Sequence, residues 1–207
     1  MISNSIKSYF KIFIWIALIL ALEACATPGK KFITISRKPD LSTGSGTERI
    51  GIAPFQDRRH NMDKRYIGYR ILLDNTRETY FIRGMDLSQA LTDVLISYYA
   101  DKGFSPVMTD AWELTPEGAR KACTGFRQIL TARINRFECR AYKKGPATDM
   151  TLDIDLTFFL GLGDRHILKT IPVSLTLEKT LLNFTAEKLQ QFIDNSMTEV
   201  IHKALNL

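Results

Sequence analysis

Cysteine and histidine are both scarce in this chain of 207 residues, which contains three of each. Three cysteines are too few for the dense disulfide framework of a small secreted scaffold. No histidine has a second histidine or a cysteine at metal-ligand spacing, and neither HExxH nor CxxC occurs. The sequence therefore predicts no metal site, and we interpret His60, His166 and His202 as surface residues.

A strong charge imbalance and a nucleophile motif are missing as well. The 28 Lys and Arg against 22 Asp and Glu leave a mild net charge of +6 in short basic clusters, so nucleic acid is not an expected partner. No Gly-x-Ser-x-Gly elbow occurs. Asp153 and Asp155 share a strand face, as an acid–base pair or cation site requires, but neighbouring threonines favour a solvated face. We expect no enzyme, no catalytic residue and no cofactor.

No apolar run is long enough to span a membrane. The longest, Ile12–Leu22, would form about 16 Å of helix, whereas the hydrocarbon core is about 30 Å thick. Lys7 and Lys11 provide positive charge ahead of the apolar segment, which is the order found in export signals. We therefore interpret residues 1–24 as a signal peptide.

The residues after this run resemble the lipobox of bacterial lipoproteins. Leu22-Glu23-Ala24-Cys25 follows its pattern except at Glu23, where a small residue is usual. The resemblance implies cleavage before Cys25, covalent diacylglycerol and acyl chain on that cysteine, and a durable membrane anchor. Ala26, in place of aspartate, implies sorting to the outer membrane of a Gram-negative host, facing the periplasm. The alternative is an ordinary secretory signal cut nearby, with Cys25 incidental.

The rest of the chain divides into a tether and one domain. Residues 25–47 comprise the lipidated cysteine and a stretch rich in proline, glycine and serine, in which only Phe32–Ile35 resembles a strand. Such a tether is flexible and could hold a domain some tens of ångströms from the membrane. Residues 48–207 are expected to form a single α/β domain.

Two main helices and one short helix are predicted in this domain. Asp86 is an N-cap with glutamine three residues on, and Gly103 is well placed to end the helix that follows. Residues 186–205 carry a continuous apolar stripe. Pro116, after Thr115, suits the first turn of a short helix.

Alternating segments predict the strands, which we place at residues 49–55, 66–73, 79–83, 104–108, 128–140, 150–160 and 167–177. A phase slip near Asn135-Arg136 predicts a β-bulge. A two-residue turn at Gly163-Asp164 would place Ile154 opposite Val173. The expected fold is α/β of the α+β type, a mostly antiparallel sheet with two main helices packed on one face.

Two surfaces are candidates for binding. A basic loop could contact lipid phosphates or another anionic envelope polymer, unless it is simply solvated; its residues are Arg58, Arg59, Lys64 and Arg65. The tip of the last hairpin is apolar on both faces, so we expect the tether or a partner protein to cover it; its residues are Phe158, Phe159, Leu162 and Leu168.

A disulfide between Cys123 and Cys139 is disfavoured but left open. Residues 128–138 span about 35 Å when extended, whereas bridged Cα atoms lie about 5.5 Å apart. Only a reversal of the chain would allow the bridge.

The order of these segments resembles the YajG-like lipoproteins over most of the mature chain. The resemblance is carried by Asp57-Arg58-Arg59, Ile67-Gly68-Tyr69-Arg70, Met85–Leu91 and Gly103–Val107. It implies location and architecture but no substrate. We therefore expect a non-enzymatic accessory or interaction component of the envelope with a protein partner. The alternative is a carrier or assembly factor for lipid or lipopolysaccharide, with an apolar ligand between helices and sheet.

Overall fold

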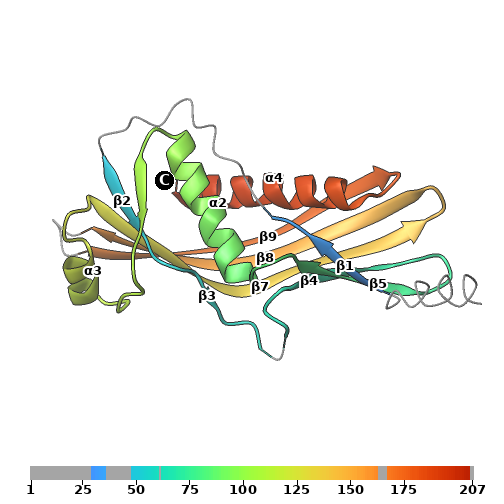
Figure 1. The fold of residues 1–207 in the computed structure, drawn as a ribbon, viewed down its shortest axis with the longest axis horizontal. Helices are drawn as coiled ribbons and strands as arrows, with labels where there is room; N and C mark the ends of the chain where they lie inside the picture. Colours follow the sequence, from blue (N-terminus) through green and yellow to red (C-terminus); the bar gives the residue numbers. More distant parts are fainter. Residues whose placement is uncertain (1–28, 36–47, 61, 163–166, 206–207) are drawn as a thin grey trace, which may run out of the picture. The chain divides into compact units, whose positions relative to one another are not determined.

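Three long antiparallel strands, β7 (Gln128–Lys144), β8 (Ala147–Leu162) and β9 (Ile167–Leu182), are the centre of the fold (Figure 1). The computed structural model describes residues 29–35, 48–60, 62–162 and 167–205. It divides into two compact units, Met1–Lys30 and Lys31–Leu207, and the second contains the whole hydrophobic core. On β8, apolar side chains alternate with polar ones, so one face of the sheet is an apolar inner face and the other is a polar outer face.

The sheet is mixed, which corrects the prediction of a mostly antiparallel one. Short strands pair in parallel with successive stretches of β7, and β6 pairs in parallel with the first of them. The remaining strands are β1 (Lys30–Ile33), β2 (Arg49–Ile52), β3 (Gln56–Asp57), β4 (Tyr66–Ile71), β5 (Arg77–Ile82) and β6 (Ser105–Met108). Their order is β1-β5-β4-β7-β2-β6, with β3 also on β7. The alternation of apolar and polar residues predicts a strand, but it does not show whether that strand pairs in parallel or antiparallel with a segment distant in the chain.

The helices begin and end where the sequence predicts. α2 (Leu87–Asp101) is capped by the Asp86 carboxylate, which accepts a hydrogen bond of 2.8 Å from the Gln89 N–H. Gly103, with φ +83°, follows its C-terminus. α2 and α4 (Ala186–Leu205) cover the inner face (Figure 1), and their buried side chains join the core of the sheet. The short helix α3 (Pro116–Ala122) begins at its predicted cap.

The predicted bulge is present in β7. The pairing of β7 with β8 shifts between Ile134 and Arg136. The Asn135 side-chain amide donates hydrogen bonds of 3.0 Å to Asp155 and to Thr157 on β8. Because the bulge adds one residue to β7, the apolar side chains before and after it face the core even though the alternation shifts by one residue there.

The register of the β8–β9 hairpin differs from the prediction by two residues. Ile154 lies opposite Leu175, and Leu162 lies opposite Ile167, so four residues rather than two separate the strands. The predicted pairing of Ile154 with Val173 is therefore wrong. A shift by an even number keeps every side chain on its face, which is why the alternation alone did not reveal it.

The segment expected to be a tether contributes a strand. β1 lies beside β5 at one end of the path, and Ile33 and Ile35 are 3% and 1% exposed in the core. Residues 30–33 of the segment expected to be a tether therefore belong to the sheet.

Candidate functional site

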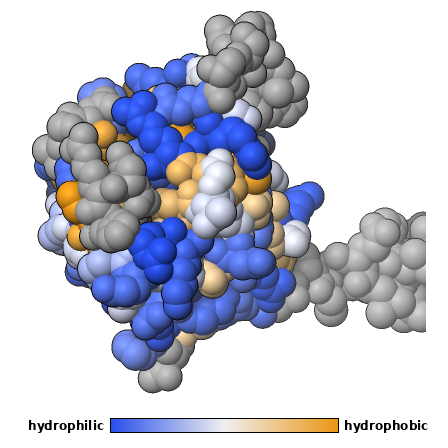
Figure 2. All heavy atoms as spheres, turned by 90° about the vertical axis from the view of Figure 1, so that its left-hand side faces the viewer, coloured by the Kyte–Doolittle hydropathy of each residue, from blue (hydrophilic) through white to orange (hydrophobic). Residues whose placement is uncertain are grey.

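A cavity of about 550 Å³ opens at one end of the outer face, between α3 and the loop that follows β6. Its volume lies within the range typical of sites for small ligands or single side chains of a partner. Phe126, Ile129 and Trp112 are the large apolar residues of its lining. Figure 2, which views this end of the molecule, shows an apolar patch enclosed by hydrophilic residues. We call this cavity the Trp112 pocket.

Two glycines allow the walls of the Trp112 pocket to come together. A Cβ at Gly161 of β8 would lie 2.8 Å from the Ala119 Cβ, so α3 sits directly on the sheet there. A Cβ at Gly118 would lie 2.0 Å from the carbonyl oxygen of Glu113, so the loop before α3 closes tightly on the helix. The Thr115 hydroxyl accepts a hydrogen bond of 3.0 Å from the Gly118 N–H and fixes the start of α3. The cavity thus has a rigid frame.

Two residues of the Trp112 pocket carry an unsatisfied polar atom beneath its surface. The Trp112 Nε1 and Thr109 Oγ1 atoms are buried, and neither has a hydrogen-bond partner among the described residues. A buried donor left unpaired costs about 1–3 kcal/mol, and because both atoms are closed to solvent, an occupant of the cavity does not reach them in this conformation. Asp110, Glu113 and Lys121 add two carboxylates and one ammonium group to the lining. This mixture favours a neutral or zwitterionic occupant with an apolar body over a simple anion.

The sequence analysis missed this site. Trp112 stands in a polar loop without periodicity, and nothing local shows that the loop folds over the sheet. The one signal available was an isolated tryptophan, because the chain has only two and the other, Trp15, belongs to the predicted signal peptide.

The chain itself covers the tip of the β8–β9 hairpin. Phe158 is 0% exposed on the inner face, and its ring meets Phe55 edge-on at 6.0 Å. Phe159 is 6% exposed on the outer face, where the Arg133 guanidinium lies 4.9 Å from its ring. Leu162 and Leu168 are half-buried. Helix α3 contacts both β8 and β9 at this end of the hairpin. We had expected the tether or a partner protein to lie over the hairpin tip, whereas in the structure a helix of the same domain lies there.

The basic loop is not one cationic surface, because Arg59 points inward. Its side chain is 3% exposed and forms an ion pair of 2.8 Å with Asp57, whose side chain is 6% exposed. It also donates hydrogen bonds to the carbonyl oxygens of Tyr66 and Phe137, at 2.7 and 3.3 Å. Burial raises the pKa of Asp57, but the hydrogen bonds and charge of Arg59 outweigh it, so the pKa is lowered. Arg59 ties the loop to β7 and is unavailable to an anion.

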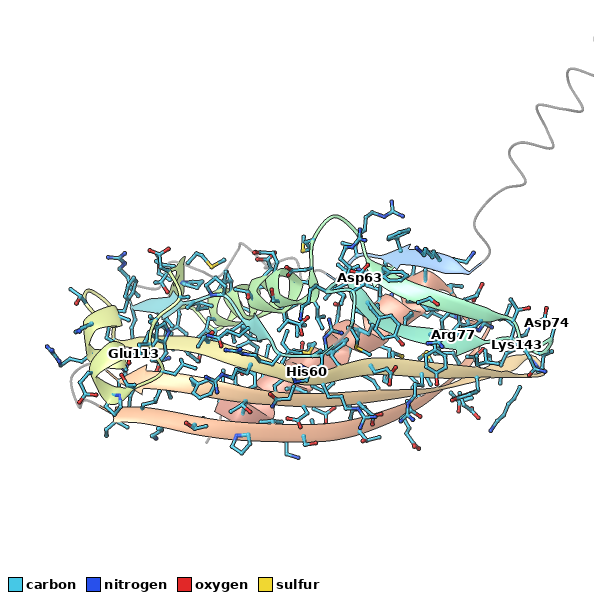
Figure 3. All side chains as sticks on the ribbon, turned by 90° about the horizontal axis from the view of Figure 1, so that it is seen from below. His60, Asp63, Asp74, Arg77, Glu113 and Lys143 are labelled. Atoms are coloured by element: carbon cyan, nitrogen blue, oxygen red, sulfur yellow. The ribbon has the colours of Figure 1, made fainter. Side chains whose placement is uncertain are left out.

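The other three cations of the loop are dispersed. The Lys64 Nζ atom lies 3.7 Å from the Asp57 carboxylate, and Arg65 pairs with Asp63 at 3.1 Å. Arg58 is exposed and donates a hydrogen bond of 3.3 Å to the Gln56 side chain. Asp63 and His60 are labelled in Figure 3. The structure therefore leaves Arg58 as the cation of this group without an acidic partner among the described residues.

Cys123 and Cys139 are both buried and are not joined to each other, so the disulfide left open above is not formed. Burial raises the pKa of the Cys139 thiol to about 12, which suppresses its reactivity. Cys25, on which the anchor depends, lies outside the described residues.

The paired aspartates on β8 do not form a reactive pair. Asp153 lies within 3.4 Å of Arg136 and also pairs with Arg140, and it accepts a hydrogen bond of 2.8 Å from Thr176. Its neighbour Asp155 accepts a hydrogen bond from the side-chain amide of Asn135, the residue at the bulge. In the described ranges, no group of three His, Cys, Asp or Glu residues is placed to hold a metal ion. No helix there combines the length and the apolar character needed to cross a membrane.

No family model and no curated protein matches the chain. Among solved structures, protein XCC0632 from Xanthomonas campestris, of family model DUF330, is similar at 10% identity over 84% of this chain and 90% of that chain, with a TM-score of 0.47. Lipoprotein GNA1162 from Neisseria meningitidis is similar at 8% identity over 75% and 99%, with a TM-score of 0.40. The hypothetical protein CT253 from Chlamydia trachomatis is similar at 8% identity over 75% and 94%, with a TM-score of 0.44. At these values the likeness carries no functional argument, which has to come from the chain's own residues.

Proposed function

We propose that this chain is a lipid-anchored lipoprotein of the bacterial envelope, held in the outer membrane and facing the periplasm. Its domain acts without catalysis, as an accessory component that binds a partner protein. The observation that carries the anchor is the sequence Leu22-Glu23-Ala24-Cys25 at the end of the apolar run Ile12–Leu22. Several acyl chains on Cys25 would anchor the protein durably.

The Trp112 pocket is the partner site in this proposal. An apolar side chain of a partner would rest on the apolar lining formed by Phe126, Ile129 and the Trp112 side chain. Tryptophan in a recessed pocket is the residue type that dominates many protein interfaces. The carboxylates and ammonium group of the lining would orient the polar backbone of the same segment.

The packing of the inner layer supports a partner protein over a lipid carried between helices and sheet. Ile193, Met197 and Val200 of α4 are each 0% exposed and belong to the core. A lipid at the middle of α4 would have to displace these side chains, at the cost of their burial, and the hollow between the end of α4 and the sheet holds only about 320 Å³.

The anchor is tested by Cys25→Ser in cells fed a clickable fatty acid. We expect fatty-acid labelling to disappear and the protein to leave the membrane fraction. Cys123→Ser is the matched control, because that thiol is buried within the domain, and it should leave labelling unchanged. Persistent labelling of the Cys25→Ser protein would overturn the proposed anchor.

The partner site is tested with a photo-crosslinking amino acid at Ala111, which lines the Trp112 pocket. We expect an adduct of defined mass in intact cells, lost when Trp112→Ala is added. A crosslinker at Glu117, exposed on α3 but outside the lining, is the control. Equal adducts from both positions, or an adduct that survives Trp112→Ala, would remove the pocket from the proposal.

A further inference from the structure

An exposed apolar surface lies at the β1 edge of the domain, distant from the Trp112 pocket. Phe32 and Met62 are 43% and 39% exposed, and the Phe32 ring lies 6.0 Å from that of Phe81. Met62 and Phe81 also line a hollow of about 340 Å³. In Figure 1, α3 lies at one end of the long strands and β1 toward the other. We call Phe32, Met62 and Phe81 the β1 surface.

The covalent chain ties the β1 surface to the anchor. Phe32 is seven positions after Cys25, and seven steps along the chain reach at most about 25 Å even when fully extended. The strands of 16 residues in the sheet are about 50 Å long. An acylated Cys25 therefore cannot reach the bilayer unless the β1 edge stays near it, whereas the far end of the sheet is free of that constraint.

Two exposed arginines border the β1 surface. Arg83 directly follows β5 and is exposed, and its N–H donates a hydrogen bond of 2.8 Å to the Ile33 carbonyl of the edge segment. The side chain of Arg65 is 51% exposed beside Asp63. Exposed apolar side chains bordered by arginine match the interface of a bilayer, where acyl chains meet anionic headgroups.

We propose that the β1 surface rests on the membrane that holds the lipid anchor. Phe32 and Met62 enter the interface, and Arg83 and Arg65 contact lipid phosphates. This inference depends on the proposed acylation of Cys25. Its consequence is a fixed orientation: the β1 edge meets the bilayer, and the Trp112 pocket is presented away from it.

Site-directed fluorescence on the lipidated protein in vesicles tests this orientation. Thr34→Cys places a thiol one residue beyond β1, and His202→Cys places one on α4 as a reference; both positions are exposed. A fluorophore attaches there selectively, because Cys123 and Cys139 are buried and the sulfur of an acylated Cys25 is blocked. With brominated lipids in the vesicle, we expect at least threefold more quenching at position 34 than at position 202. Equal quenching would overturn the proposal.

A matched pair of variants tests the residues themselves. Phe32→Ser with Met62→Ser should reduce quenching at position 34 to that at position 202. Met108→Ser, which removes a comparable methionine, 45% exposed on β6, should not change it. Arg83→Ser should reduce quenching more in vesicles with phosphatidylglycerol than in phosphatidylcholine alone. No effect of the double substitution would overturn the assignment of Phe32 and Met62.

Flotation of the same samples separates this proposal from the anchor. If Cys25 is not acylated, the protein fails to float with vesicles and takes up no fatty acid. If only the docking of the β1 surface is wrong, the protein floats normally and both positions are quenched equally.

Discussion

At the scale of single residues, Arg59 shows how far a side chain can depart from the character of its segment. It stands among polar and charged residues, yet it is the most buried of the basic loop. Its guanidinium joins Asp57 to the carbonyl oxygens of Tyr66 and Phe137, and so fixes the loop after β3 against β4 and β7. Buried ion pairs add little net stability, but breaking one leaves an uncompensated charge.

Replacing Arg59 should therefore be strongly destabilising. We expect Arg59→Met to lower the free energy of unfolding by about 3–5 kcal/mol, because the buried Asp57 carboxylate loses its directly bonded partner and keeps only Lys64, 3.7 Å away. Urea titration followed by circular dichroism measures this. The neighbouring Arg58→Ala is the control and should stay within about 0.5 kcal/mol, since Arg58 is exposed. Similar small effects for both variants would show that Arg59 is not structural.

The Arg59–Asp57 ion pair predicts that the free energy of unfolding falls at acid pH. The pKa of Asp57 is lowered in the folded protein: burial raises it, but the bonds from Arg59 outweigh burial. A lowered folded pKa means that the contribution to stability is complete above the unfolded pKa, near 3.9, and is lost as the pH falls through the folded value. Asp57→Asn should thus have its largest effect near neutral pH and converge with the parent as the pH falls below the lowered pKa of Asp57 in the folded protein. Unfolding free energies across this range measure it, and a constant difference would contradict the linkage.

At the scale of elements, the sequence predicted what local chemistry determines. The Asp86 and Thr115 caps, the end of α2 before Gly103 and the bulge at Asn135 all follow from neighbouring residues. The parallel pairing of β2, β3 and β4 with β7 does not, because each pairing joins residues that are 71 to 78 positions apart in the chain. The site was equally hidden, since the Trp112 pocket exists only where the loop after β6, α3 and the sheet meet.

The register of the β8–β9 hairpin gives a direct test at this scale. Asp155 and Ser174 lie opposite each other on the outer face, whereas the two-residue turn would place Asp155 opposite Pro172. We expect a disulfide to form on mild oxidation of a protein with Asp155→Cys and Ser174→Cys, because directly opposed Cβ atoms lie about 4.5–5.5 Å apart. Non-reducing peptide mapping detects it. The pair Asp155→Cys with Pro172→Cys is diagonal and should crosslink poorly; the reverse preference would restore the shorter turn.

At the scale of the whole molecule, β7 unites the domain. It pairs with β2, β3 and β4 along one edge and with β8 along the other, while α2 and α4 cover the inner face of the same sheet. The core residues of all these elements form one cluster, which also includes Ile33 and Ile35 from the β1 segment. A single core predicts a single cooperative unfolding transition, in which the β1 edge also takes part.

At the β1 edge, a flexible tether and a structural strand lead to opposite expectations for the stability of the domain. A chain that begins at residue 36 lacks β1 and with it Ile33 and Ile35, each almost fully buried. Burial of two such side chains stabilises by about 3–5 kcal/mol, a large share of the 5–15 kcal/mol typical of a domain. We expect the midpoint of urea unfolding to fall sharply relative to a chain that begins at residue 29. The fluorescence of Trp112, the one tryptophan in both chains, reports the transition. Equal midpoints would show that residues 29–35 add no stability and behave as part of the tether. The short chain between Cys25 and the domain would then no longer require the β1 surface to lie near the membrane.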